Sequence, residues 1–274
     1  AFTKLRQKVG NYAGVTVEKK SGTLVLAKDR VINVIDLPGT YSLAVRSPDE
    51  QVARDVILGR ATDTAKPDMI VCVVDAGNLE RNLYLVTQIQ DLGVPIVIAL
   101  NMMDEVERQG KEINVRKLSQ KLGVPIVPTV ASQNKGIEEL KQLIAEGVQV
   151  YYKRQWRMAP DLEEEVEHLV RLLMQHEGMS VDEAFSEALI LMSLGSKLKN
   201  DVKSNPLKKF FKAELIGQIN MIQDRLRQKG LRARTAAIEA RYDWIKSILV
   251  ECVKEKNKKG TDWTDKLDKV LTHK

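Results

Sequence analysis

Three short groups of residues, in a fixed order along the chain, could bind a nucleoside triphosphate and its metal ion. Gly14–Thr16 (GVT) comes first, Asp36–Gly39 (DLPG) follows an apolar run, and Asn101–Asp104 (NMMD) follows another. Each is expected where a strand passes into a loop, which is where an open α/β sheet binds its ligand. Together they predict a guanine-nucleotide switch. The phosphate-binding loop G-x-x-x-x-G-K-[ST] that belongs with such motifs does not occur in the 274 residues.

The first two motifs would serve the phosphates and the metal ion. An aspartate at the end of a strand, here Asp36, can hold Mg²⁺ through the water shell of the ion. Gly39 would let its backbone N–H approach a γ-phosphate without a side chain in the way. The Thr16 hydroxyl could join the Mg²⁺ shell only while a γ-phosphate is present, which would make it a switch. Thr16 and Gly39 are therefore the catalytic candidates. Taken singly, Thr16 could be just a β-branched strand residue, and DLPG could be a plain turn.

The third motif would choose the base. The carboxylate of Asp104 can accept two hydrogen bonds from the N1–H and N2–H₂ edge of guanine, which adenine cannot donate. Asn101 precedes it at the end of the apolar run 94–100, and the Met102 side chain could lie against the face of the base or belong to the core. The structural alternative is a helix N-cap, since Asn and Asp both cap well.

A further loop at 130–136 follows a predicted strand and precedes a predicted helix. The backbone N–H groups of Ala131, Ser132 and Gln133 could reach the O6 atom of guanine. Taken by itself this is an ordinary loop. Four weak signals in the right order, each at a strand end, are much less easily explained by chance.

The elements that must position these residues alternate in type along the first half of the chain. Apolar runs predict strands, and the spacing of apolar residues on one face predicts helices. The strands are expected at 15–26, 30–36, 68–75, 94–100 and 124–130, and the helices at 78–92, 115–122 and 136–147. This alternation predicts a mostly parallel sheet with helices on both faces.

Beyond about residue 150 the strand-like runs disappear and helical patterns take over. Helices are expected at 161–177, 181–198, 206–228 and 233–256. Ser180 and Glu183 have the spacing of a capping box for the second of them. The core of this helical part is expected to include Leu169, Leu173, Leu189, Leu215, Ile219, Ile222, Ile238, Ile245 and Leu249. We therefore expect two domains, at 1–150 and 151–274.

Composition excludes several other functions. The net charge of +6 is spread out and is not accompanied by interleaved aromatics, so nucleic-acid binding is not expected. Only three histidines occur, and Cys72 and Cys252 are isolated, which predicts core residues in a reducing compartment rather than a zinc site. No apolar run reaches the roughly 18–20 residues that span a bilayer.

Longer stretches resemble a known family. The segment 5–18 (LRQKVGNYAGVTVE) is similar to switch I of FeoB, the bacterial ferrous iron transport protein, and 36–43 (DLPGTYSL) resembles its switch II. The segment 75–85 (DAGNLERNLYL) resembles the most specific stretch of that family. The resemblance continues through NMMD and 136–140 (GIEEL), weakens in the helical part, and returns at 240–242 (ARY) and 264–273 (TDKLDKVLTH).

This resemblance implies a P-loop-NTPase-type G domain followed by an all-α domain that is GDP-dissociation-inhibitor-like. It implies the cytoplasmic part of a bacterial inner-membrane protein that regulates an Fe²⁺-permeation region and works with small Feo accessory proteins. The implied ligands are GTP or GDP, Mg²⁺ and K⁺, the last held partly by the backbone carbonyls of Gly10 and Tyr12. Residue 40 is threonine rather than the glutamine that positions water in other GTPases, so slow hydrolysis is expected.

The ends of the chain prompt two further expectations. Residues 1–4 (AFTK) align with the end of the helix that follows the P-loop in the family, so we expect the P-loop to lie upstream of Ala1. Residues 254–274 carry seven lysines against four acids, a net charge of 7 − 4 = +3, as expected beside a membrane span. The alternative is a guanine-nucleotide sensor without hydrolysis, in which the loop is truly missing. A translation-factor-like GTPase is disfavoured by the 75–85 stretch.

Overall fold

A computed structural model of the chain describes residues 8–12, 17–26, 30–43, 47–148, 154–194 and 213–255. It begins with a three-stranded antiparallel sheet in the order β1–β2–β3, where β1 is Lys8–Asn11, β2 is Glu18–Val25 and β3 is Val31–Asp36. Strands β2 and β3 lie within or near the ranges expected for the first two strands, and they pair antiparallel with Lys20 opposite Asp36. Strand β1 was not foreseen from the sequence. DLPG follows directly at the end of β3.

A second sheet is parallel, in the order β4–β5–β7, with β4 at Ile70–Asp75, β5 at Ile96–Asn101 and β7 at Ile126–Pro128. Alternate residues of β5 enter two different cores. Ile96, Ile98 and Leu100 pack with the core that contains α2 and α4, whereas Val97 and Ala99 pack with α5 and the β2–β3 hairpin. A strand covered on both faces reads as a continuous apolar run, and the expected α/β architecture is confirmed.

In the described part of the chain the two sheets are not hydrogen-bonded to each other, so β3 and β4 are each the last strand of their sheet. Val73 of β4 keeps 68% of its surface exposed, and Val31 of β3 keeps 58%. The parallel portion is therefore smaller than the single mostly parallel sheet that the sequence predicts.

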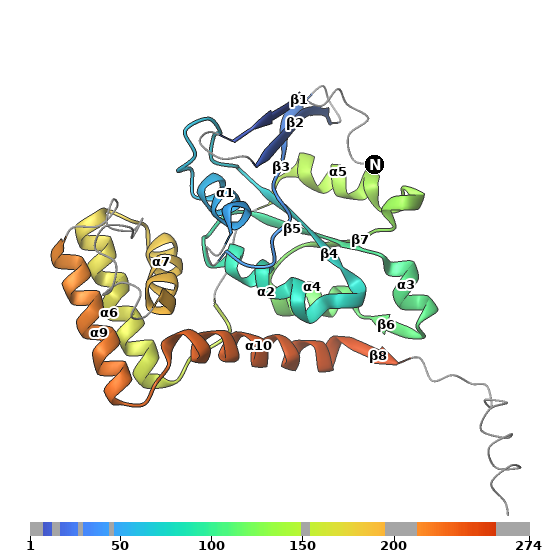
Figure 1. The fold of residues 1–274 in the computed structure, drawn as a ribbon. Coiled ribbons are helices and arrows are strands. Elements are labelled where there is room, and N and C mark those ends of the chain that lie inside the picture. Colours follow the sequence, from blue (N-terminus) through green and yellow to red (C-terminus); the bar gives the residue numbers. More distant parts are fainter. Residues whose placement is uncertain are drawn as a thin grey trace, which may run out of the picture.

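The helices of the first half lie near the expected positions, and Figure 1 shows them around the parallel sheet. They are α2 at Leu79–Gln90, α4 at Val115–Leu122 and α5 at Ile137–Glu146. Two more, α1 at Pro48–Ile57 and α3 at Met103–Arg108, were not predicted. Ser47 caps α1 through a complete capping box with Glu50, a signal the sequence contains. Gly123 ends α4 with a left-handed backbone, which glycine adopts readily at this position.

The second half forms a helical unit from α6 (Pro160–Glu177), α7 (Val181–Leu194) and α9 (Ala213–Gln228), which is joined by the start of α10 (Ala233–Cys252). The predicted capping box at the start of α7 is present, since the backbone N–H of Ser180 and that of Glu183 each bond the side chain of the other residue. Leu169, Leu173, Leu215, Ile219 and Ile222 are buried in its core, as predicted. Among the described helices, none is both long enough and apolar enough to cross a membrane.

Helix α10 leaves this unit and runs along the first one (Figure 1). Ile245 is buried in the core around the parallel sheet, and Leu249 packs against the same core, so both belong there rather than to the helical core predicted for them. Ile238 is half-buried and belongs to neither cluster. The helix also ends earlier than predicted, at Cys252.

A short strand, β8 (Val253–Glu255), follows α10 directly and pairs antiparallel with β6 (Lys111–Ile113). Lys111 faces Glu255 and Glu112 faces Lys254, so each exposed pair joins opposite charges. Three-residue strands are too short to leave a periodic signal, which is why the expected helix to residue 256 was wrong at its end. The last described residues are thereby fixed to the first unit.

Candidate functional site

The motif residues gather at the carboxyl ends of strands. Asp36 ends β3, Asp75 ends β4 and Asn101 ends β5, with Asp75 and Asn101 in register. The Asp75 carboxylate accepts bonds from the backbone of Gly77 (2.8 Å) and the side chain of Asn78 (2.6 Å), so it shapes the turn into α2. Since Asp75 is bonded within its own turn, Asp36 and Asn101 are the two strand-end residues left as site candidates.

Asn101 joins two of the predicted base-facing loops. Its side-chain Oδ1 accepts a hydrogen bond from the backbone N–H of Ala131 (3.0 Å) and one from the hydroxyl of Thr129 (3.3 Å). Thr129 is almost fully buried and was not singled out from the sequence. The 129–136 loop is therefore held against the end of β5, and Asn101 is a positioning residue for that loop.

Asp104 lies in the first turn of α3, and its side chain is about one-third exposed (36%). The N-cap position is Met102, and no side chain caps this helix, so the helix-cap alternative for Asn101 and Asp104 does not hold here. A weak ion pair to Arg108 at 3.8 Å leaves the carboxylate accessible. Met102 has a left-handed backbone (φ 64°) and a side chain that is 46% exposed, so it is not a core residue.

The 129–136 loop is folded tightly. Residues Ala131–Gln133 form one 3₁₀ turn (η3), and Val130 and Lys135 bridge its base. Gly136 closes the loop with φ +76°, and a β-carbon there would lie 2.1 Å from the carbonyl oxygen of Pro128. Ser132 and Gln133 are exposed, as a surface that meets a ligand requires.

Of the three amides predicted to reach guanine O6, two are already engaged. The N–H of Ala131 donates to Asn101, and the N–H of Gln133 donates to the carbonyl of Val130 (2.9 Å). Within the described bonds, the amide of Ser132 has no protein acceptor. It is the one of the three that is available to a ligand.

Of the residues predicted to bind Mg²⁺ and the phosphates, Asp36 and Gly39 lie in the described part of the chain. Asp36 is exposed, its carboxylate has no partner in the described part of the chain, and its carbonyl accepts a hydrogen bond from the Tyr12 hydroxyl (3.3 Å). Gly39 is exposed, and a β-carbon there would have no described atom within 4 Å. The Thr40 hydroxyl donates to the carbonyl of Ser42 (2.6 Å). A free carboxylate and an open backbone suit a hydrated Mg²⁺ ion beside a phosphate.

Thr16 lies outside the described residues, and the nearest described residues on its two sides are Tyr12 and Val17. The backbone N–H of Tyr12 donates to the carbonyl of Val17 (3.0 Å), and both side chains are buried against Val52 and Val56 of α1. Burial is the main cause that raises the pKa of Tyr12, followed by the nearby charges of Asp63 and Asp36. The Tyr12 side chain is thus uncharged and holds this end of β1 against α1.

The two K⁺ candidates lie in or beside the β1–β2 ladder. Gly10 pairs with Lys19, two residues from the bonded pair of Tyr12 and Val17. Since bonded pairs recur at every second position of an antiparallel ladder, the carbonyl of Gly10 is engaged with Lys19. In this conformation the carbonyl of Gly10 thus already accepts one hydrogen bond, and its role as a K⁺ ligand stays a prediction. Among the described residues there is also no group of three or more His, Cys, Asp or Glu that could hold a metal ion.

A cleft of about 660 Å³ lies away from the motifs, between the start of α2, α3, β6 and α10. Its lining includes Arg81, Gln109, Lys111 and Tyr242, and none of the predicted site residues. The base-facing residues instead form an open surface at the strand ends. A surface that takes one edge of a planar base does not need to be a deep cavity.

Comparison with known proteins gives a consistent picture. The sequence profile of ferrous iron transport protein B matches residues 1–144. The Fe(2+) transporter FeoB of Salmonella typhimurium is 48% identical over 147 residues, which are 52% of this chain and 18% of that protein. A fusion of Fe(2+) transport protein A and Fe(2+) transporter FeoB from Porphyromonas gingivalis is 34% identical over 97% of this chain and 31% of its own length. The chain thus spans less than a third of these relatives.

Solved structures extend the likeness to both units. The cytosolic domain of L. pneumophila FeoB is 32% identical, with a TM-score of 0.74 and 92% of each chain covered. A point mutant of S. thermophilus NFeoB bound to GDP is 33% identical, with a TM-score of 0.75 and the same coverage. The cytosolic domain of T. maritima FeoB in its GMPPNP form has a TM-score of 0.71 at 28% identity.

Proposed function

This chain belongs to the ferrous iron transport protein B family, its first unit is the GTP-binding G domain of that family, and from this we propose how its residues work. The proposed activity is guanine-nucleotide binding with slow hydrolysis of GTP, in the regulatory region of a bacterial ferrous iron membrane transporter. The observation that carries the proposal is the bond between Asn101 and Ala131, which brings the NMMD motif and the 129–136 loop to one surface.

Base recognition is proposed to divide between two loops. The carboxylate of Asp104 accepts the N1–H and N2–H₂ groups of guanine, and the Ser132 amide donates to O6. Ala131 and Gln133 shape the loop through their own bonds. Exposed Met102 lies against the face of the base. An adenine base would leave Asp104 without donors and set its N6 amino group against the Ser132 amide, which disfavours it.

At the phosphate end, Asp36 is proposed to bind the water shell of Mg²⁺, and Gly39 to approach the γ-phosphate through its backbone. Bound Mg²⁺ would neutralise charge that develops on the phosphate oxygens. Thr16 is proposed as the Mg²⁺ ligand that senses the γ-phosphate. Thr40 follows DLPG and its hydroxyl is bonded to Ser42, so it has no spare donor to orient water, which supports slow turnover. K⁺ binding by Gly10 and Tyr12 is proposed only for a state in which β1 releases Gly10 from Lys19.

The wider role is proposed from the relatives. The G domain at 1–150 and a GDP-dissociation-inhibitor-like helical domain at 151–274 would lie on the cytoplasmic side and regulate an iron-permeation region of the full-length protein. Small Feo accessory proteins are proposed partners, and the Porphyromonas relative is named as a fusion with Fe(2+) transport protein A.

The hydrolysis part of the proposal is tested by phosphate release. We expect release of phosphate from GTP above the buffer background. Release no faster than the background would instead favour the alternative raised by the sequence, a guanine-nucleotide sensor without turnover.

The base assignment is tested by Asp104→Asn. We expect the variant to lose affinity for a fluorescent GDP analogue and to gain preference for the xanthine analogue, because an amide at this position donates where the carboxylate accepted. Titrations of both nucleotides give the ratio of affinities. Glu107→Gln, an exposed residue on the same helix, is the matched control and should leave the ratio unchanged.

In the same titrations, Asp36→Ala is expected to remove the dependence of nucleotide affinity on Mg²⁺. An unchanged guanine preference in Asp104→Asn would exclude Asp104 from the base site. Wild-type Mg²⁺ dependence in Asp36→Ala would exclude Asp36 from the metal site.

A further inference from the structure

We propose that Lys19 is a positioning residue for Asp36, and that the loop it holds links Asp36 to helix α7 of the helical unit. The proposal rests on the assignment of Asp36 to Mg²⁺ made above. It concerns the loop 58–69, which joins α1 to β4 and is called the α1–β4 loop below. Two separate groups of charged side chains hold α1 and this loop.

On the first side, Lys19 of β2 holds the α1–β4 loop. Its ammonium group donates to the Thr64 hydroxyl (2.6 Å), the Asp63 carbonyl (2.8 Å) and the Asp63 carboxylate (3.1 Å). An ammonium group has three N–H donors, so every one of them has an acceptor. The Lys19 side chain is only 19% exposed, and its hydrogen bond lowers the pKa of Asp63, which keeps that carboxylate charged.

The same ammonium group connects this contact to Asp36. It lies 5.4 Å from the centre of the Tyr12 ring, within the range of a cation–π contact. The Tyr12 hydroxyl in turn bonds the carbonyl of Asp36. Lys19 therefore holds the Tyr12 ring in place. Tyr12 in turn holds the end of β3, which carries Asp36.

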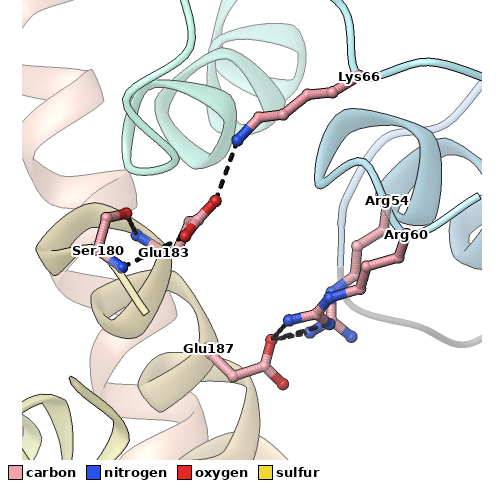
Figure 2. A network of polar contacts seen from close by, with 6 residues as sticks. All are labelled: Arg54, Arg60, Lys66, Ser180, Glu183 and Glu187. Carbon is pink, nitrogen blue, oxygen red and sulfur yellow. Dashed lines mark hydrogen bonds and ion pairs between the residues drawn. The ribbon is translucent and has the colours of Figure 1, made fainter. Parts of the chain in front are cut away.

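On the second side, α7 holds α1 and its loop, as Figure 2 shows. Arg54 of α1 bonds the Glu187 carboxylate, Arg60 approaches the same oxygen at 3.4 Å, and Lys66 bonds Glu183 at 3.0 Å. Glu187 is 2% exposed. A carboxylate this deeply buried requires its cationic partners, so α7 can change position only if α1 and the loop follow or the ions separate.

Helix α1 and the α1–β4 loop lie between the two groups of contacts. Val52 and Val56 pack with Tyr12, while Arg54 points to Glu187, so the two faces of α1 serve different partners. In the loop, Gly59 has φ +70°, and a β-carbon there would lie 2.9 Å from the β-carbon of Lys66. Because polar contacts hold this loop at Asp63, Thr64 and Lys66, a displacement of one contact is expected to reach the other. The position of α7 and the position of Asp36 are thus expected to depend on each other.

Lys19→Met tests the first contact, because it keeps chain length and removes the charge and donors. We expect at least about tenfold faster hydrogen exchange at the Tyr12 amide in nucleotide-free protein. In the nucleotide titration, the Mg²⁺ concentration for half-maximal effect should rise several-fold. Lys19→Arg should recover most of both effects, since arginine also donates to several acceptors. Lys111→Met, in the distant strand β6, is the control.

Glu187→Gln tests the second contact with the same two measurements. We expect it to shift the Mg²⁺ midpoint although Glu187 lies in the other unit, and the double variant with Lys19→Met to deviate from the product of the single effects. Glu167→Gln, exposed on α6, is the matched control.

Each outcome is decisive. Unchanged exchange and an unchanged Mg²⁺ midpoint in Lys19→Met would overturn the proposal while nucleotide binding by the wild type still stands. Strictly multiplicative effects in the double variant would overturn the link to α7. Failure of the wild type to bind nucleotide would reject the proposed function instead, and the exchange measurement would still decide the role of Lys19 in holding Tyr12.

Discussion

Backbone conformation at single residues shapes the candidate base site. Met102 and Asn134 both have positive φ. Asparagine tolerates this region, whereas for methionine it costs about 1 kcal/mol or more. Within the described part of the chain they are the two non-glycine residues in this region, and each lies in a loop assigned to the base. Such strain persists where the surrounding structure requires it, and here the bonds of Asn101 to Thr129 and Ala131 supply that requirement.

Gly136 allows a direct test of this site. Gly136→Ala should displace the 129–136 loop, because a β-carbon would overlap the Pro128 carbonyl. We expect a loss of about 2–4 kcal/mol in the free energy of unfolding and a clear loss of guanine affinity. Gly110→Ala is the control, since it has a similar φ of +73° but an open environment, and it should cost only about 1 kcal/mol. Equal losses in urea unfolding for the two variants would contradict the role of the close contact.

Sequence motifs pointed to the candidate site residues but not to the residues that hold them in place. Asp36, Asn101 and Asp104 were predicted; the first two end strands β3 and β5, and Asp104 lies in the first turn of α3. Lys19 was not, because its partners Asp63 and Thr64 are 44 and 45 residues away. A contact of that range depends on the fold, and no local spacing encodes it.

At the scale of elements, strong periodicity and caps gave the right helices. The bounds predicted for α4 are those observed, and the Ser180–Glu183 box starts α7 as expected. The face of α10 was assigned wrongly at Ile245 and Leu249, since one apolar stripe can serve either of two cores. Which core a helix joins is decided by its tertiary partners, and periodicity does not report it.

The contact between α6 and α9 gives a pH-dependent prediction. Arg225 bonds both carboxylate oxygens of Glu165 at 2.7 Å, and this hydrogen bonding is the main cause that lowers the pKa of Glu165. Because the folded pKa lies below the unfolded value of about 4.3, the stabilisation is present above about pH 5 and is lost as pH falls through the folded pKa. Glu165→Gln should therefore lower the free energy of unfolding by about 1 kcal/mol at pH 7 and by less in acid. The effect is small because Arg225 is 41% exposed, so solvent screens the pair.

Urea midpoints at pH 7 and pH 4 measure this difference, with Glu167→Gln as the control for an exposed glutamate on the same helix. A difference between wild type and Glu165→Gln that grows as the pH falls would contradict the assignment. It would mean that the carboxylate is stabilised in its protonated form.

At the scale of the whole molecule, a buried ion pair joins the two units. Arg241 of α10 bonds Asp91, the residue after α2, at 2.6 Å, and the two side chains are 4% and 2% exposed. The guanidinium also lies 4.1 Å from the centre of the Trp156 ring, in the segment that enters the helical unit. The pair thus fixes where α10 crosses from one unit to the other.

Arg241→Met removes the guanidinium and leaves the buried carboxylate of Asp91 without it. We expect a loss of about 3–5 kcal/mol in the free energy of unfolding. The double variant Asp91→Asn with Arg241→Met should lose less than the single one, because the buried negative charge that Arg241 balanced is gone. Chemical denaturation of the three proteins measures this. A double variant less stable than Arg241→Met would show that the charge pair is not what joins the units.

The pairing of β6 with β8 has a mechanical consequence. Glu255 faces Lys111, and only Gln109 and Gly110 separate Lys111 from the end of α3, the helix that carries Asp104. Tension on the chain beyond Glu255 would therefore first load a three-residue ladder, and then the helix proposed to read guanine. The force needed to part β8 from β6 limits the tension that the nucleotide site can feel. Above that limit β8 would separate from β6 first, and the proposed base site around Asp104 would keep its structure.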